Sequence, residues 1–224
     1  MKKQYTKFEN ANAILNGMDD ICDEFVDGFV DAHNVPIDNN YMYDWLLRSI
    51  VDVCKFDHSV LYIACGTSGY MRLFNNIKRF VGIDFSKKMI TASKKESKKY
   101  DINSDFHCTT FEEFQTDEKF DVVWMGPYGH YVPFTLDILK KAQNVLNKDG
   151  FVLCSTTDPM YKGLYGRLKE FMHCLLYKRT FKYDRVKNIE SMIKEANLDI
   201  VLKLRMKATE GYSIFWIGKK TTDA

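Results

Sequence analysis

Residues 60–69 read VLYIACGTSG, and residues 81–90 read VGIDFSKKMI. Each stretch begins with an apolar run of the length of a β-strand. A loop of small residues follows the first run, and the second run ends at an acid, Asp84. The segment between the two runs is long enough for a helix. This order predicts a strand, a tight turn, a helix and a second strand with a carboxylate at its end.

Such a unit can hold a cofactor that contains adenosine. A tight turn lets the backbone approach the ligand closely, and the acid accepts hydrogen bonds from ribose hydroxyls. That acid usually lies about 20 residues after the glycine turn, and Asp84 follows Gly66 by eighteen positions. Two simpler interpretations remain open: a turn that binds nothing, and an acid that caps a helix. Ser86 already suits the capping role, so we expect a nucleotide-like cofactor and an enzyme.

The composition sets wider bounds. The chain has 224 residues, of which 46% are hydrophobic and 28% charged, as in ordinary globular proteins. A net charge of +2 is too small to predict a polyanionic partner. No apolar run approaches membrane-spanning length, and no apolar segment follows the N-terminus as in a secretory signal. The six cysteines are scattered without a C-x-x-C pair, so we expect a reduced, cytoplasmic protein without a metal site.

Strand-like and helix-like segments alternate from residue 58 onward. This alternation predicts an α/β fold, with a doubly wound, mostly parallel seven-stranded sheet. Two final strands joined by a short loop predict a C-terminal hairpin, whose last strand runs antiparallel to its neighbour. The expected strands are 59–64, 79–83, 104–108, 120–125, 150–155, 198–206 and 212–219. The expected helices are 69–77, 86–99, 111–115, 134–147 and 184–196.

Before this core, apolar residues recur at helical spacing between Ile14 and Val30, and a second helix is expected from Asn40 to Cys54. We therefore expect residues 1–57 to form an N-terminal helical cap or lid. Residues 58–224 form the expected core. Residues 156–185, between the fifth strand and the last helix, are rich in aromatic side chains. We expect this insertion to supply an acceptor pocket or a face for dimerisation.

The two quoted stretches resemble the class I S-adenosylmethionine-dependent methyltransferases, which favour an acid, a Ser two positions on and a Met five positions on. The resemblance extends over about residues 58–220. It implies that Asp84 holds the ribose, that Phe85 and Met89 line the adenine, and that Ala64 and Gly66 pass beneath the methionine part. S-adenosylmethionine is the implied cofactor and S-adenosylhomocysteine the product. The full implied set is Tyr62, Ala64, Cys65, Gly66, Asp84, Phe85, Met89, Thr110, Phe111 and Met125.

The chain departs from the family pattern at four positions. The family commonly has an acid where this chain has Tyr62, and glycine where it has Ala64 and Ser68. Thr110 replaces an acid that usually lies beside the adenine amine. We expect these departures to weaken contacts with the cofactor.

The strand at 120–125 ends in the loop MGPYGHY, residues 125–131. The carboxyl end of a strand in an open α/β sheet faces the ligand crevice, so this loop is expected near the transferred methyl group. His130 is the candidate base, because an imidazole titrates near neutral pH and can take the acceptor's proton. Tyr128 and Tyr131 are expected to orient the acceptor or contact the sulfonium. Simple packing of all three side chains is the alternative.

We therefore expect methyl transfer from S-adenosylmethionine to an oxygen or nitrogen atom of a small polar metabolite. The loop lacks the Asn or Asp found in methyltransferases that act on base amines, so nucleic acid is not an expected partner. Three alternatives stay open: an RNA methyltransferase, a non-catalytic protein that binds S-adenosylmethionine, and an NAD-dependent oxidoreductase that uses the same first turn.

Overall fold

The computed structural model describes residues 59–68, 71, 77–125, 134–157, 186–208 and 211–221. The chain divides after Gln115 into two compact units. The expected N-terminal cap and most of the expected insertion lie outside the described residues, so the boundaries predicted for them stay predictions. Among the residues described, no helix combines the length and the apolar composition needed to cross a bilayer.

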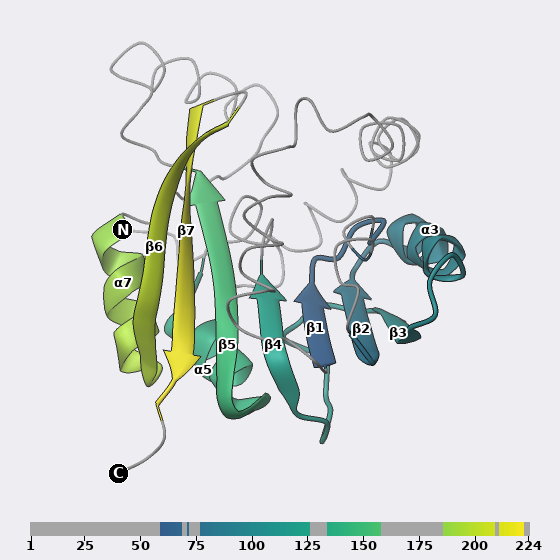
Figure 1. Cartoon of the computed structure of the whole chain (residues 1–224), viewed down its shortest axis with the longest axis horizontal. Coiled ribbons are helices and arrows are strands. Elements are labelled where there is room, and N and C mark those ends of the chain that lie inside the picture. The colour runs from purple at the N-terminus through teal and green to yellow at the C-terminus, as the bar shows by residue number, and fades with distance from the viewer. Residues whose placement is uncertain are drawn as a thin grey trace, which may run out of the picture. The chain divides into compact units, whose positions relative to one another are not determined.

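The first unit contains three parallel strands and one described helix. These elements are β1 (Ser59–Ile63), β2 (Arg79–Asp84), α3 (Lys87–Ser97) and β3 (Asn103–Cys108). The strand order is β3-β2-β1, and α3 packs against β2 and β3 (Figure 1). Residues 60–63 of β1 are all buried, as expected for a strand of a parallel sheet that is covered on both faces. In register, Leu61 pairs with Val81 and Asp84 with Cys108.

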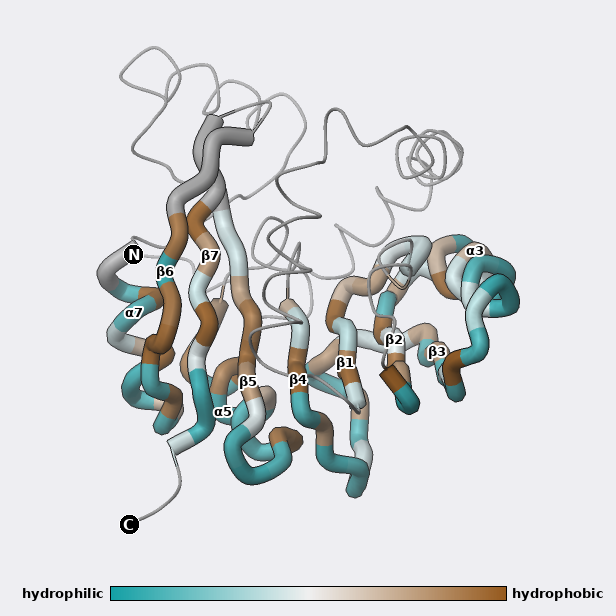
Figure 2. The backbone as a smooth tube through the Cα atoms, viewed as in Figure 1, coloured by the Kyte–Doolittle hydropathy of each residue, from teal (hydrophilic) through white to brown (hydrophobic). Residues whose placement is uncertain are grey.

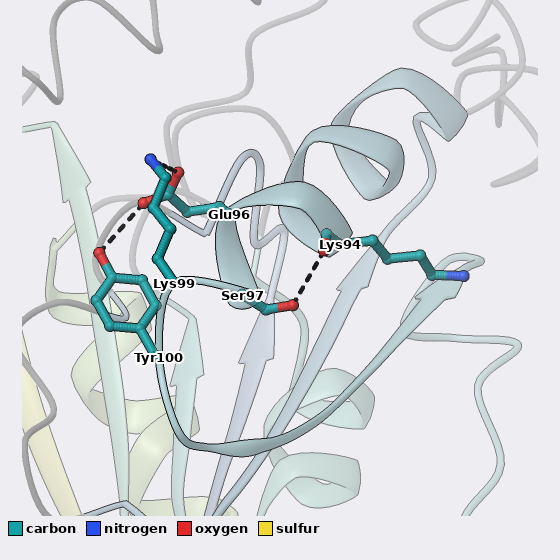
Figure 3. Close-up of polar contacts among 5 residues, drawn as sticks. All are labelled: Lys94, Glu96, Ser97, Lys99 and Tyr100. Carbon is teal, nitrogen blue, oxygen red and sulfur yellow. Dashed lines mark hydrogen bonds and ion pairs between the residues drawn. The ribbon is translucent and has the colours of Figure 1, made fainter.

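Helix α3 begins and ends with side-chain hydrogen bonds. Ser86 is the N-cap, and its hydroxyl oxygen accepts a hydrogen bond from the backbone N–H of Met89 at 3.3 Å, which confirms the expected cap. At the other end the Ser97 hydroxyl donates to the Lys94 carbonyl at 3.2 Å (Figure 3). Glu96 pairs with Lys99 at 2.6 Å and accepts from the Tyr100 hydroxyl at 3.1 Å (Figure 3).

The second unit contains four strands and two described helices. They are β4 (Phe120–Met125), α5 (Leu136–Asn144), β5 (Leu146–Thr157), α7 (Val186–Glu195), β6 (Leu198–Ala208) and β7 (Gly211–Lys220). The strand order is β4-β5-β7-β6 (Figure 1). Strand β4 runs parallel to β5, whereas β7 runs antiparallel to both β5 and β6. The seven strands belong to one mixed sheet, which confirms the expected fold class and its C-terminal hairpin.

The interior of the second unit is mainly apolar. Figure 2 shows hydrophobic residues along the middles of the strands and hydrophilic ones in the bend at the start of β5. Helices α5 and α7 contact one another and cover β5 and β6. Leu139, Ile193 and Trp216 are each fully buried at 0% exposure. Such burial is the main favourable contribution to folding.

Two expected helices differ from the structure. The helix expected at 134–147 ends at Asn144, and Leu146 already pairs with Phe120 as part of β5. The side chain of Leu146 is buried at 1% exposure, so pairing in the sheet takes precedence over helical spacing. The helix expected at 111–115 is only a turn, in which the N–H of Phe114 donates to the carbonyl of Thr110. A segment of this length gains too few hydrogen bonds to nucleate a helix.

Candidate functional site

In the loop at residues 64–68, which follows β1, every second residue has a positive φ angle. Ala64, Gly66 and Ser68 adopt the left-handed conformation, with φ values of 55°, 53° and 55°. Residues with a Cβ atom disfavour this region, whereas glycine enters it freely. Two of these three positions are the ones at which the chain departs from the glycines of the class I methyltransferases. The loop backbone therefore has a conformation that suits glycine, although alanine occupies position 64 and serine position 68.

Gly66 is not crowded by any residue that the structure describes. Among these residues, none places an atom within 4 Å of the position that a Cβ atom on Gly66 would occupy. The backbone angle of Gly66, and not crowding by described residues, therefore explains why this position favours glycine. A position that the described residues leave uncrowded suits close approach of a ligand to the backbone.

Asp84 ties this loop to the start of α3. It is the last residue of β2 and only 8% exposed. Its Oδ2 atom accepts from the N–H of Gly66 at 2.9 Å, and its Oδ1 atom accepts from the N–H of Ser86 at 2.9 Å. Burial raises the pKa of the Asp84 carboxyl, and the two N–H groups oppose that rise. Each carboxylate oxygen keeps a second lone pair, so Asp84 can still accept hydrogen bonds from ligand hydroxyls.

Two serines hold the other side of the loop. Ser93, on α3, is fully buried at 0% exposure, and its hydroxyl donates to the carbonyl of Gly66 at 2.6 Å. The Oγ atoms of Ser68 and Ser93 lie 3.0 Å apart. A hydroxyl has one hydrogen, and Ser93 gives its own to Gly66, so Ser68 is the donor to Ser93. Sequence reasoning did not assign either serine to the site. The available signal was a serine on the inward face of the helix that follows Asp84.

Cys65 contributes its backbone to the loop. Its N–H donates to the carbonyl of Ile83 at 3.0 Å, which fastens the loop to β2. Its side chain is buried at 3% exposure, with the sulfur 3.9 Å from the Oγ of Ser93. Burial and then the charge of Asp84 raise the pKa of the Cys65 thiol to about 12. The thiol is therefore neutral at physiological pH and a poor nucleophile.

Tyr62 lies in the core of the first unit. Its side chain is 2% exposed, and its ring meets the ring of Phe80 edge to face, with centroids 6.2 Å apart. An aromatic pair of this geometry stabilises a core beyond the area it buries. The assignment of Tyr62 to the cofactor stays a prediction, and the structure shows its packing.

The ends of β2 and β3 meet beside Asp84. The carbonyl of Asp84 accepts from the N–H of Thr109 at 3.0 Å. Thr110 follows, and its hydroxyl oxygen accepts from the N–H of Glu113 at 3.3 Å. Phe111 is buried at 2% exposure. The structure thus brings the loop at 64–68, Asp84 and the turn from Thr110 together at the carboxyl ends of parallel strands, where α/β sheets bind ligands.

Phe85 and Met89, predicted to line the adenine, are partly exposed beside this region. Met125 is fully buried at the end of β4, in the second unit. Tyr128, His130 and Tyr131 lie outside the described residues, so their catalytic assignments stay predictions. Among the described residues, no group of His, Cys, Asp and Glu side chains could hold a metal ion.

Comparison with known sequences gives a family and partial relatives. A family model described as a methyltransferase domain matches residues 55–205. A demethylmenaquinone methyltransferase of Alkalihalophilus pseudofirmus is 31% identical over 119 residues, which cover 49% of this chain and 50% of the relative. A ubiquinone biosynthesis O-methyltransferase of Bradyrhizobium sp. is 30% identical over 110 residues, covering 49% of this chain and 44% of the relative. The chain thus spans about half the length of these curated relatives.

Solved structures share the fold. An S-adenosylmethionine-dependent methyltransferase from Clostridium acetobutylicum has a TM-score of 0.67 and 14% identity, over 88% of this chain and 99% of that one. The N-methyltransferase NodS from Bradyrhizobium japonicum has a TM-score of 0.63 and 13% identity, over 83% and 99%. A second NodS structure contains S-adenosylhomocysteine. At such low identity these likenesses show the fold alone.

Proposed function

This chain belongs to the methyltransferase-domain family of S-adenosylmethionine-dependent enzymes, and we propose that it methylates an oxygen or nitrogen atom of a small polar metabolite. Family membership confirms the resemblance to class I methyltransferases, the expected enzyme class and the expected cofactor. It also removes the nicotinamide alternative. The acceptor and the roles of individual residues belong to the proposal.

The observation that carries the proposal is the position of Asp84. A buried carboxylate at the end of β2 accepts from the amide of Gly66 at 2.9 Å, and no described residue lies within 4 Å of where a Cβ atom on that glycine would be. In this arrangement the remaining lone pairs of Asp84 would accept hydrogen bonds from the two ribose hydroxyls of the bound cofactor. The Gly66 backbone would hold the methionine part of the cofactor.

The reaction itself needs few protein groups. When bound, the cofactor supplies an electrophilic methyl group on a positively charged sulfur. His130 takes the proton that the acceptor's hydroxyl or amine loses, while Tyr128 and Tyr131 orient the acceptor. Alignment of the two reactants supplies most of the rate enhancement.

The names of the relatives support a small organic acceptor. One relative is named for demethylmenaquinone, and the other for ubiquinone biosynthesis and O-methylation. The overall charge of +2 also gives no sign of a nucleic-acid footprint. We therefore favour a small molecule over RNA as the acceptor.

Calorimetric titration with S-adenosylhomocysteine tests the proposal, on wild type and on Asp84→Ala. We expect wild type to bind with a dissociation constant on the order of micromolar, and Asp84→Ala to bind roughly a hundredfold more weakly, since charge-assisted hydrogen bonds are lost. Asp105→Ala is the matched control. Asp105 is a half-exposed carboxylate of the same unit that pairs with Arg79 at 2.7 Å, and its loss should leave binding unchanged.

The outcomes separate the alternatives. Absence of binding by wild type would overturn the proposed function. Equal binding by wild type and Asp84→Ala would keep the cofactor but remove Asp84 from ribose recognition. Normal binding without methyl transfer to any small hydroxyl, amine or RNA acceptor would indicate a non-catalytic binding protein.

A further inference from the structure

Gly66 is held on both sides of its backbone by side chains that lie far away in the sequence. Its N–H donates to Asp84 at 2.9 Å, and its carbonyl accepts from Ser93 at 2.6 Å. The two partners come from different elements, the end of β2 and the middle of α3. The orientation of both peptide groups of Gly66 is therefore set by a strand and a helix together.

Ser93 behaves unlike the other hydroxyl residues of its helix. Thr91 and Ser97 donate to carbonyls of α3 itself, those of Lys87 and Lys94, which is the usual partner for such residues in helices. Ser93 instead reaches a carbonyl 27 residues earlier in the chain. Its hydroxyl thus joins the helix to the loop and does not serve the helix alone.

Unfavourable backbone angles in the loop explain why hydrogen bonds from outside it are needed to hold its conformation. Ala64 and Ser68 hold left-handed conformations without being glycine, so the loop backbone favours relaxing to other angles. Ser68 donates to Ser93 through Oγ atoms that are 3.0 Å apart. One of these two residues, Ser68, is thereby tied to the same hydroxyl that orients Gly66.

We propose that Ser93 is a positioning residue for the cofactor, and that Ser68 acts through it. Ser93 orients the carbonyl of Gly66, which keeps the Gly66 amide directed at Asp84 and the Asp84 carboxylate directed at the ribose. This inference rests on the proposed function. Neither serine contacts the methyl group or the acceptor in this role, so their loss changes cofactor affinity and not the chemical step.

The test is calorimetric titration with S-adenosylhomocysteine on Ser93→Ala, Ser68→Ala and the double variant. Loss of the buried hydrogen bond to Gly66 should weaken binding by roughly tenfold in Ser93→Ala, with a smaller effect in Ser68→Ala. The double variant should bind as weakly as Ser93→Ala and no more weakly, because Ser68 acts through Ser93. Ser97→Ala, which removes a hydroxyl from the same helix (Figure 3), is the matched control and should bind as wild type does.

Amide hydrogen exchange gives a second readout without ligand. In Ser93→Ala the Gly66 amide should exchange faster, while the amides of the β1–β2 ladder keep their protection. Unchanged exchange at Gly66 together with unchanged affinity would overturn the inference, and so would additive losses in the double variant. If Ser93→Ala does not fold, Ser68→Ala decides the question. If wild type fails to bind S-adenosylhomocysteine, the proposed function fails, and the exchange comparison still judges the role of Ser93 in the loop.

Discussion

The loop end of the first unit and the interior of the second unit are buried in different ways. Among the described residues, the polar side chains buried in the first unit are Thr67, Ser68, Asp84, Ser86 and Ser93, whereas the second unit buries Ser155 and Thr156. Both units bury large apolar side chains at 0% exposure, such as Phe80 in the first unit and Trp216 and Leu139 in the second. The two buried polar residues of the second unit also lie near the carboxyl end of a strand, β5.

Buried polar side chains around the loop orient the backbone, whereas buried apolar side chains mainly stabilise the fold. Burying an apolar side chain favours folding without requiring any direction. Burying a polar one costs free energy unless it is hydrogen-bonded, and its partners then fix directions. Around Gly66 the first unit buries polar side chains despite this free-energy cost, and their hydrogen bonds orient the backbone as a ligand site requires. The four predictions that follow test this division, from the largest expected effect to the smallest.

Leu139→Ala should remove stability and leave cofactor binding alone. Leu139 lies on α5 at 0% exposure, and truncation of a buried leucine typically costs about 2–5 kcal/mol of unfolding free energy. Urea unfolding measures the loss, and calorimetry on the folded variant measures the affinity. Leu136→Ala, at a partly exposed position of the same helix, should cost less. A comparable loss of affinity in Leu139→Ala would show that the two regions are not separable.

Asp84 should affect stability and binding in opposite directions as pH falls. Burial holds the pKa of the Asp84 carboxyl in the folded state above its ordinary value of 3.8, so the folded state binds the proton more readily than the unfolded state. Relative to Asp84→Asn, wild type should therefore gain stability as pH falls through the raised pKa. Over the same range its affinity for S-adenosylhomocysteine should fall, because the carboxylate becomes neutral. Unfolding and calorimetry across a pH series check both trends, and a pH-independent affinity would contradict the assignment.

Ala64→Gly should stabilise the protein. The left-handed conformation costs a residue with a Cβ atom about 1–2 kcal/mol, and glycine loses roughly 0.5–1 kcal/mol in chain entropy. The expected net gain is about 0.5–1 kcal/mol in unfolding free energy. Ala92→Gly, inside α3, is the matched control and should lose about 1 kcal/mol. A loss at position 64 would mean that the alanine side chain makes a contact worth more than the backbone angle costs.

Glu190→Gln should have the smallest effect. The hydrogen bond from Lys203 holds the pKa of Glu190 below its ordinary value of 4.5, and the indole N–H of Trp216 also donates to it at 3.2 Å. The pair is partly exposed, so its loss should cost less than about 1 kcal/mol at neutral pH. This contribution is present above pH 4.5 and disappears as pH falls through the lowered pKa. Urea unfolding at neutral and low pH checks this, and an equal difference at both would contradict it.

Local patterns predicted much of the candidate site. The order of apolar run, small-residue loop and acid predicted Asp84, Gly66 and the Ser86 cap, because all three lie within one strand–turn–helix–strand unit that is continuous in sequence. The same reasoning misplaced the end of α5, because Leu146 pairs with Phe120, 26 positions away in sequence. It also missed Ser93, whose partner lies 27 residues earlier.

Patterns within the sequence were enough to predict the α/β class, the approximate places of the seven strands and the acid at the end of β2. Those features follow from hydrophobic periodicity and turn chemistry, which act over short spans of chain. The packing of Tyr62 on Phe80, the burial of the Cys65 thiol and the hydrogen bond from Ser93 to the Gly66 carbonyl became visible in the folded structure alone. These depend on which distant segments the fold brings into contact, and no local spacing encodes that.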